Sequence, residues 1–416
     1  MTDPQLQRLL DTLWRMESPR LVARLARMLG DLDSAEELAQ DALVAALEHW
    51  PEQGIPDNPA AWLMATAQRR AIDRLRQRHL HAQRQAQVID EQQDYAMGAD
   101  QSEHLDDIGD DLLRLVFVAC HPALPADARV ALTLRLLCGL STHEIARAYL
   151  QPEPTIAQRI VRAKRLLAER KVAFEVPRRQ ELPQRLQSVL DVVYLVFNEG
   201  YAASSGEDWV RPTLCEEALR LGRVLAGLMP NTVSVLGLLA LMELQASRLR
   251  ARVAADGAAV LLLDQDRSRW DWLQIARGQA ALAQAITLGG ADDAYVLQAG
   301  IAACHARARQ AEQTDWQAIA ALYGRLLDVM PSPVVELNRV VAVAQAQGAA
   351  AAWPLLQHLL DDPQLQGYAP LQAVRADLLA RLGRAAEARQ AFEDAAALSA
   401  NAREREALLT RAAAVQ

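Results

Sequence analysis

The chain is poor in lysine, in cysteine and in long apolar runs. Lysine occurs only at Lys164 and Lys171, so no lysine follows a glycine and a phosphate-binding P-loop is excluded. No apolar run reaches the roughly 18 residues of a membrane helix, and the N-terminus lacks the apolar stretch of a signal peptide, so we expect a cytoplasmic protein without membrane contact. Four cysteines lie far apart, without a C-x-x-C pair, which predicts buried, reduced thiols. They are Cys120, Cys138, Cys215 and Cys304.

The composition of the 416 residues favours helices. Hydrophobic residues make up 51% of the chain and aromatic residues only 5%. Most of the hydrophobic residues are Ala and Leu, which favour helices, whereas β-branched residues are few. At roughly 150 residues per domain the length allows two or three domains. We therefore expect an all-α fold.

Positive charge is confined to two short stretches of an acidic chain. The formal net charge is -8, yet arginines cluster at 69–84 and again at 159–170. Acidic residues gather at 31–48 and 90–111. Net charge describes solubility, whereas binding to phosphate needs only a local basic patch. The acidic balance therefore does not exclude a nucleic-acid partner.

The first section predicts a helix with one acidic face. Ser34 and Glu37 have the spacing of a capping box, in which both side chains bind free backbone amides at a helix start. Apolar residues then recur at helical spacing as far as Trp50. The opposite face carries Glu37, Gln40, Asp41 and Glu48.

A helix with a basic surface is predicted next. Asn58 can cap this helix and Pro59 can occupy its first position. Four apolar residues are expected to point inward, and the arginines to be exposed. The inward residues are Leu63, Ala67, Ile72 and Leu75.

Residues 141–168 have the pattern of a helix-turn-helix. Ser141 and Glu144 form a second capping box, and the prolines at 152 and 154 end the first helix and start a second at Thr155. The second helix buries a stripe of Ile156, Ile160, Ala163 and Leu167. Its exposed face carries Gln158, Arg159, Arg162 and Arg165, with Lys164 at the edge. Arginine can pair with guanine and glutamine with adenine in the major groove, although an ordinary amphipathic hairpin with a solvated basic face is the alternative.

Two further sections complete the chain. Residues 81–110 are polar and glutamine-rich, with too little apolar surface to offset the entropy of ordering, so we expect a flexible linker. Residues 182–416 hold longer helices with tetratricopeptide-like signals. Gly383 and Gly348 lie 35 residues apart at similar positions between apolar runs, close to the repeat period of roughly 34 residues. We predict a helical solenoid there.

The stretch from Phe197 to Tyr201, F-N-E-G-Y, admits two interpretations. It could be a contact surface against the other domains or a ligand. It could also be a helix end with Gly200 as the C-terminal cap residue, which we favour because nothing nearby completes a site.

The motifs together resemble the extracytoplasmic-function sigma factors of bacteria. Their promoter-melting domain is resembled by two stretches, AEELAQDALVAALEHW and NPAAWLMATAQRRAIDRLRQR. The helix-turn-helix resembles their domain that binds the −35 element. The resemblance covers about residues 5–175. It implies region 2 at 1–80, the linker at 81–110, region 4 at 111–175 and a regulatory domain at 182–416. The implied function is to bring core RNA polymerase to promoters and to open the DNA.

The resemblance also implies roles for individual residues. The acidic helix would bind the clamp coiled coil of the polymerase, through Glu37, Gln40 and Asp41. The following loop and helix would capture and hold the −10 element, through Asp57, Asn58, Trp62, Arg69, Arg70, Arg74 and Arg76. Many family members have asparagine at the position of Arg69, which puts base reading there in doubt, and Asp73 fits an ion-pair partner as well as a DNA contact. The second helix of region 4 would bind the −35 element, through Thr155, Gln158, Arg159, Arg162, Lys164 and Arg165.

In one subgroup of these sigma factors a C-terminal extension replaces a separate anti-sigma protein. The chain resembles this subgroup in the stretch LDVVYLVFNEGYAASSG and in the tetratricopeptide-like tail. Members of this subgroup tend to be encoded beside small proteins of the DGPF type. The resemblance thus implies core polymerase (clamp and flap) and promoter DNA as partners. A DGPF-type protein, or a contact within the chain, would act on the extension. No cofactor, metal or catalytic residue is expected, because the polymerase does the chemistry.

Two other classes of protein were weighed. An enzyme is disfavoured because His143-Glu144-Ile145-Ala146-Arg147 has arginine where a zinc-binding H-E-x-x-H needs its second histidine, and Ser204-Ser205-Gly206 lacks the glycine of a nucleophile elbow. An ordinary DNA-binding regulator would have no use for the melting helix or the acidic helix. Binding to core polymerase separates that regulator from a sigma factor.

Overall fold

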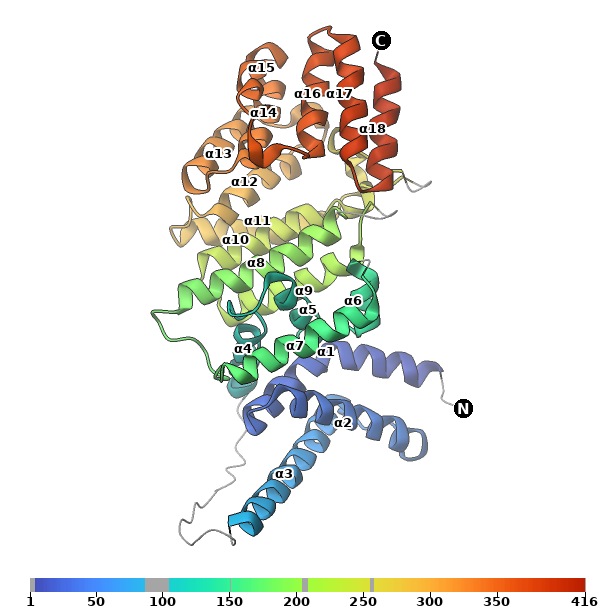
Figure 1. Cartoon of the computed structure of the whole chain (residues 1–416), viewed down its shortest axis with the longest axis vertical. Coiled ribbons are helices and arrows are strands. Elements are labelled where there is room, and N and C mark those ends of the chain that lie inside the picture. Colours follow the sequence, from blue (N-terminus) through green and yellow to red (C-terminus); the bar gives the residue numbers. More distant parts are fainter. Residues whose placement is uncertain (1–3, 87–104, 150, 204–208, 255–257, 416) are drawn as a thin grey trace. The chain divides into compact units, whose positions relative to one another are not determined.

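The computed structural model describes residues 4–86, 105–149, 151–203, 209–254 and 258–415. Within these ranges the chain is helical and contains no β-strand, only a single bridge between Val253 and Ala259 (Figure 1). The all-α prediction is confirmed. The helices form two compact units, residues 1–192 and 193–416, and the boundary lies inside one helix, α8.

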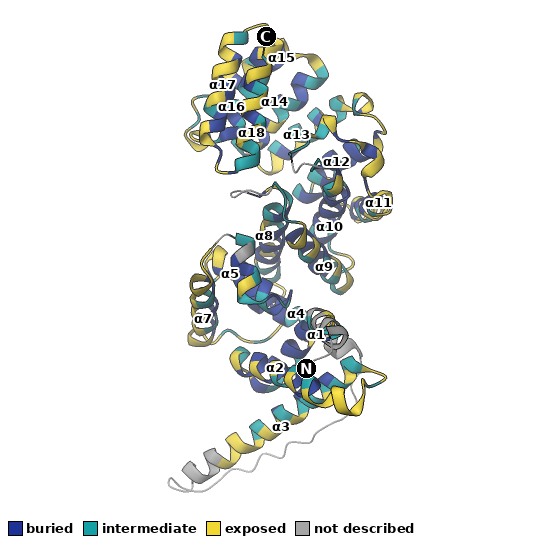
Figure 2. Cartoon of the chain, turned by 90° about the vertical axis from the view of Figure 1, so that its right-hand side faces the viewer, coloured by how far each residue is buried: buried dark blue, intermediate teal, exposed yellow. Residues whose placement is uncertain are grey.

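The first unit contains seven helices before α8 among its described residues. They are α1 (Pro4–Leu29), α2 (Leu32–Gln53), α3 (Pro59–Ala86), α4 (Leu105–Ala119), α5 (Ala126–Leu136), α6 (Thr142–Tyr149) and α7 (Glu153–Glu169). Helix α1 packs against α2, α3 and α4, and α7 packs against α5 and α6. Residues 76–80 of α3 are exposed (Figure 2), which leaves Arg76 and Arg78 on the surface.

Two expectations about this unit need correction. The linker predicted at 81–110 is helical at both ends, because α3 continues to Ala86 and α4 begins at Leu105; residues 87–104 lie outside the described ranges. Ile72 does not point inward: its exposed fraction is 39%, while Ala71 is fully buried. Residues 63, 67 and 71 are four apart and share one face, and Ile72 is rotated by about 100° from that face.

The sequence patterns also did not predict a buried carboxylate that pairs with arginines. Asp111, at the border of the expected linker, is fully buried in α4 and binds Arg114 of its own helix at 2.6 Å. It also binds Arg24 and Arg27 of α1 at 3.4 and 3.3 Å. A buried carboxylate needs such partners, because an uncompensated buried charge is costly. Asp111 thereby joins α4 to α1.

The second unit is a succession of helices, each packed on its neighbours. After α8 (Leu182–Tyr201) come α9 (Pro212–Leu228), α10 (Val233–Ala246), α11 (Trp272–Thr287), α12 (Ala294–Arg307), α13 (Trp316–Val329), α14 (Pro333–Gln347), α15 (Ala349–Gln357), α16 (Ala369–Arg381), α17 (Ala385–Leu398) and α18 (Ala402–Ala414). One apolar cluster joins α12 to α14, the next joins α14 to α16, and a third joins α16 to α18. Gly348 and Gly383 lie between helices with φ of 93° and 76°, which only glycine adopts freely. The predicted helical array is confirmed.

The F-N-E-G-Y stretch is the last turn of α8, so the predicted helix end is confirmed, but Gly200 is a packing residue within that turn and not the cap. Gly200 lies inside α8, and a Cβ atom there would be 2.6 Å from the backbone nitrogen of Cys215 and 2.9 Å from Cβ of Leu214. Glycine is needed because α9 passes directly over it. Glu199 forms an ion pair with Arg211, and Phe197 is fully buried.

The cysteine prediction holds for three of the four thiols. Cys120, Cys138 and Cys215 are buried and Cys304 is half-buried, and none of these four described residues forms a disulfide. Burial raises the pKa of Cys120 to about 11 and that of Cys215 to about 12. Such thiols stay protonated near neutral pH and are poor nucleophiles.

Candidate DNA and polymerase interface

The helix-turn-helix forms as its capping and apolar patterns predict. The backbone nitrogen of Glu144 donates to Oγ of Ser141 at 3.1 Å, and the backbone nitrogen of Ser141 donates to Oε2 of Glu144 at 2.8 Å. The second helix, α7, begins at Glu153 rather than at Thr155, because the helix already accommodates Pro154 in its first turn. The four stripe residues predicted for α7 are all buried: Ile156, Ile160, Ala163 and Leu167.

The outer face of α7 carries the residues expected to read the −35 element. Thr155, Gln158, Arg162 and Arg165 are exposed. Arg165 binds Glu169 one turn later at 2.7 Å, an exposed pair of small energetic value. Arg162 forms no ion pair among the described residues, which leaves its guanidinium available to a ligand.

Arg159 is held differently from its neighbours. Its Nε lies 2.9 Å from Oδ2 of Asp127 on α5, and its side chain is only 25% exposed. A cavity of about 330 Å³ lies between the two helices, lined by residues that include Asp127, Gln158, Arg159 and Arg162. Arg159 thus joins α7 to α5, and its Nε is not available to a base while the pair with Asp127 holds.

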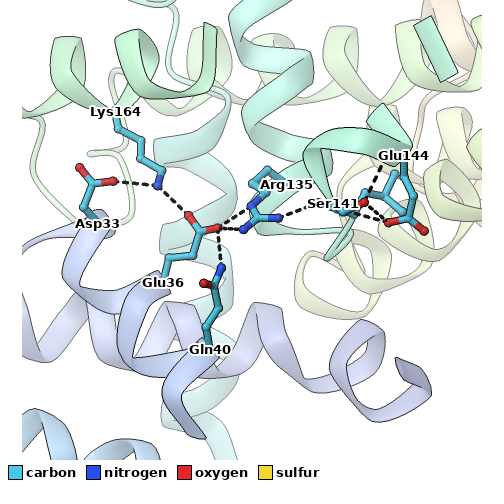
Figure 3. Close-up of polar contacts among 8 residues, drawn as sticks. Asp33, Glu36, Gln40, Arg135, Ser141, Glu144 and Lys164 are labelled. Atoms are coloured by element: carbon cyan, nitrogen blue, oxygen red, sulfur yellow. Dashed lines mark hydrogen bonds and ion pairs between the residues drawn. The ribbon is translucent and has the colours of Figure 1, made fainter. Parts of the chain in front are cut away.

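Lys164 is not a free cation in this structure. Its Nζ lies 2.8 Å from Oδ1 of Asp33 and 2.6 Å from Oε2 of Glu36, both on α2 (Figure 3). Burial alone would lower the pKa of Lys164, but Glu36 and Asp33 outweigh it and the net pKa is raised, so the lysine stays charged. Local periodicity could not reveal these partners, because they are 131 and 128 residues away in sequence.

Helix α2 begins three residues before the predicted start, at Leu32. Asp31 is its cap, and its carboxylate accepts from the backbone nitrogen of Ser34 at 2.9 Å. The capping box predicted for Ser34 is therefore wrong. Ser34 is buried in the first turn, where its hydroxyl accepts from Nη2 of Arg78 at 2.9 Å. Aspartate is an equally good cap residue, and nothing in the local pattern decides between the two.

Two of the carboxylates expected to bind polymerase are paired with arginines expected to bind DNA. Glu37 accepts from Nη1 of Arg74 at 2.7 Å, and Asp41 lies 3.6 Å from Nη1 of Arg70. Gln40 is exposed, and its amide donates to Glu36 at 3.4 Å. All four charged side chains are between 32% and 59% exposed, so these pairs are cheap to separate.

Arg69 and Arg76 occupy the exposed part of α3. Arg76 lies 3.6 Å from Asp73, one turn earlier, and both side chains are at least 67% exposed. This contact makes Asp73 an ion-pair partner, one of the two roles considered for it. Arg69 is exposed and forms no ion pair with any described residue.

The residues expected to capture a base lie in the loop before α3 and in the first turn of α3. Asn58 caps α3, its Oδ1 accepting from the backbone nitrogen of Ala61 at 3.0 Å, and α3 begins at Pro59 as predicted. Asp57 is exposed, whereas Trp62 is half-buried with its ring 5.5 Å from Trp50 in an edge arrangement. The cap fixes the start of α3, and Trp50 fixes the ring of Trp62 beside it.

Neither a metal site nor a membrane span emerges from the described part of the chain. None of its clusters of His, Cys, Asp and Glu has the three members that could hold a metal ion. None of its helices is both long enough and apolar enough to cross a bilayer.

Three family models match the chain in the order expected. Sigma-70 region 2 matches residues 13–80, Sigma-70 region 4 matches 114–167, and a family of unknown function, DUF6596, matches 185–286. An uncharacterized protein of Rhizobium meliloti (strain 1021) is 43% identical over 391 residues, which cover 93% of this chain and 91% of that protein. No solved structure matches.

Sigma-70 proteins bind promoter DNA and direct RNA polymerase to it, and they are not themselves enzymes. The matched segments coincide with the parts of the structure that carry the acidic helix, the basic helix and the helix-turn-helix. The chain belongs to the sigma-70 family as a factor of the extracytoplasmic-function type with a C-terminal helical extension.

Proposed function

We propose that α7 places Gln158, Arg159 and Arg162 in the major groove of the −35 element. Thr155, Lys164 and Arg165 would bind the flanking phosphates. The supporting observation is the exposed face of Gln158 and Arg162, on a helix whose opposite stripe is buried. A rigid helix with exposed Arg and Gln near its start meets the requirement for direct base reading.

The −10 element would be held by the other half of the first unit. Asp57, Asn58 and Trp62 would surround an unstacked base, since such a base needs a hydrogen-bonding pocket and an aromatic wall. Arg69, Arg70, Arg74 and Arg76 would bind backbone phosphate. Glu37, Gln40 and Asp41 would meet the basic coiled coil of the polymerase clamp, which is opposite in charge. Since core polymerase and promoters lie in the cytoplasm of bacteria, we place the chain there.

Polymerase binding would release the arginines of α3 for DNA. Because Arg74 and Arg70 pair with Glu37 and Asp41, a basic partner that takes these carboxylates leaves both arginines without counter-charges. The two ligands then assist each other, and by linkage the assistance is mutual. This coupling follows from the pairs on the surface of α2 and α3.

The experiment is in-vitro transcription from the promoter of the protein's own neighbouring operon, with purified core polymerase and the full chain. Specific initiation is expected. Gln158→Ala with Arg162→Ala should abolish promoter choice without loss of core binding, and Glu37→Gln with Asp41→Asn should weaken core binding. Failure of the wild type to bind core would refute the proposal and favour an ordinary DNA-binding regulator.

The extension would regulate the factor, alone or with a small protein of the DGPF type. The same assay compares the full chain with a fragment that ends after α8, at Tyr201. A more active fragment identifies an inhibitor, and a less active one identifies a required part. Equal activity of both, with and without an added DGPF-type protein, would contradict control by the extension.

A further inference from the structure

The first turn of α2 binds region 4 through three charge-assisted contacts. Lys164 of α7 reaches Asp33 and Glu36, and Arg135 of α5 reaches Oε1 of Glu36 at 2.5 Å (Figure 3). Oppositely charged groups at these distances attract strongly when partly shielded from water, and the side chains of Lys164 and Glu36 are only 10% and 11% exposed. The contacts join the helix expected to face polymerase to the helix expected to read DNA.

The two carboxylates differ in how firmly they hold region 4. Glu36 has two cationic partners and the amide of Gln40, so it stays paired with Arg135 when Lys164 leaves. The side chain of Asp33 is 71% exposed, which makes its bond to Lys164 weak and readily exchanged. Glu36 is thus the anchor of the contact, whereas the ion pair of Asp33 with Lys164 breaks readily.

The docked arrangement disfavours DNA on electrostatic grounds. It pairs the positive charge of Lys164, one of the two lysines in the chain, with carboxylates. It also places the exposed Asp33 carboxylate at the side of α7. A duplex that approaches α7 therefore loses one phosphate contact and meets a negative charge, which repels its backbone.

We propose that the first turn of α2 is a docking surface for α5 and α7 of region 4, anchored by Glu36, which withholds Lys164 from DNA until these two helices separate from α2, while α4 stays joined to α1 through Asp111. The proposal rests on the proposed DNA-binding function of α7. Docked and DNA-bound forms compete for the same lysine, so whatever weakens docking strengthens DNA binding.

The test uses the full chain and two readouts. Fluorophores on cysteines introduced at Gln53 of α2 and Ala168 of α7, both exposed, report docking by energy transfer, after Cys304→Ser removes the half-buried thiol. Binding to a short duplex of mixed sequence is measured in parallel. Glu36→Gln should lower the transfer efficiency. If about nine tenths of the molecules are docked, it should also tighten duplex binding about tenfold.

Three further variants separate docking from a general charge effect. Asp33→Asn keeps the Glu36 anchor, so transfer should persist while duplex binding tightens by roughly twofold to fivefold, the range for an exposed pair. Lys164→Gln leaves Arg135 on Glu36, so transfer should fall less than in Glu36→Gln, and duplex binding should not tighten because the phosphate contact is lost as well. Glu48→Gln removes the same charge from an exposed site on α2 and should change neither readout. Circular dichroism verifies that each variant is folded.

The outcomes are distinct. Unchanged transfer in Glu36→Gln overturns the docking surface, and reduced transfer with unchanged duplex affinity overturns the withholding of Lys164. If no variant binds duplex but transfer still falls in Glu36→Gln, the proposed DNA-binding function fails while the docking surface stands.

Discussion

Replacement of Gly200 by alanine should destabilise the second unit, because α8 and α9 are in direct backbone contact there. The new Cβ would lie 2.6 Å from the backbone nitrogen and 2.9 Å from Sγ of Cys215, and 2.9 Å from Cβ of Leu214. Favourable contacts between such atoms need roughly 3.5 Å or more, so the shortest contact is about 1 Å too close. Two of the three atoms are backbone or Cβ, so no rotamer change relieves the clash and the helices must move apart.

The expected loss follows from two opposing terms. Overpacking a tight interior contact costs about 1–3 kcal/mol. Alanine regains up to about 1 kcal/mol over glycine inside a helix. The first term exceeds the second over most of its range, so the net destabilisation should be up to about 2 kcal/mol. It should appear first as faster exchange of the α9 amides, since α9 is the helix displaced.

Gly227→Ala provides a matched control on the adjacent helix. A Cβ at Gly227, within α9, meets nothing within 4 Å. Only the propensity term applies there, so this variant should be more stable by up to about 1 kcal/mol. Hydrogen exchange by mass spectrometry, with urea unfolding followed by tryptophan fluorescence, measures both variants.

The result decides what the F-N-E-G-Y stretch does. If Gly200→Ala is as stable as the wild type, the close approach of α8 and α9 is refuted. If it is also defective in transcription at unchanged stability, the stretch is a contact surface after all. If transcription falls only in proportion to the loss in the free energy of unfolding, the stretch has a packing role.

Three further predictions concern DNA and pH. Arg162→Ala should cost about 1–3 kcal/mol of promoter affinity and relax the preference at one base pair, measured by competition with single-base variants of the −35 element; an equal loss on all sequences would contradict base reading. For duplex binding by the factor without core polymerase, Arg69→Ala should reduce the slope of log K against log salt by about 0.9, as for one lost phosphate contact, whereas Arg70→Ala should change it less because Asp41 already neutralises Arg70. Burial lowers the pKa of His305 to about 3, with Arg248 and Arg267 adding to the effect, so the folded second unit favours the neutral ring. The contribution of the neutral ring to the free energy of unfolding should be fully present above about pH 6.5 and should fall by up to about 1.4 kcal/mol per pH unit below that. Urea titrations at a series of pH values measure it. His305→Gln should flatten this dependence, and an unchanged slope would refute the assignment.

Local patterns predicted the parts of the interface that local physics determines. The cap at Asn58, the capping box of Ser141 and Glu144, and the stripe from Ile156 to Leu167 each depend on residues within a few turns, so spacing alone reveals them. The failures at the start of α2 and at Ile72 are also local. In each case two nearby residues suited one position, as cap or as inward-facing residue, and only the tertiary packing determines which of them occupies it.

Charge partners could not be predicted in the same way. Arg135 and Glu36 are 99 residues apart, and Arg24 and Asp111 are 87 apart. Nothing in the spacing of either residue indicates the other, because such pairs exist only once separate helices pack. Gly200 fails for a related reason: a glycine near a helix end looks the same whether it caps the helix or lets another helix approach.

The same long-range pairs explain how an acidic chain can bind a polyanion. The net charge of -8 is not opposed to the basic helices, because carboxylates on α2 and α5 neutralise Arg70, Arg74 and Arg159 in the free protein. Exposed pairs of this kind are worth at most about 1 kcal/mol each, so the dense negative charge of DNA can replace the carboxylates one by one. Each replacement costs part of the gain from the phosphate contact. The pairs therefore lower the affinity for arbitrary DNA and for promoters alike, so the base contacts at a correct promoter decide where the factor binds.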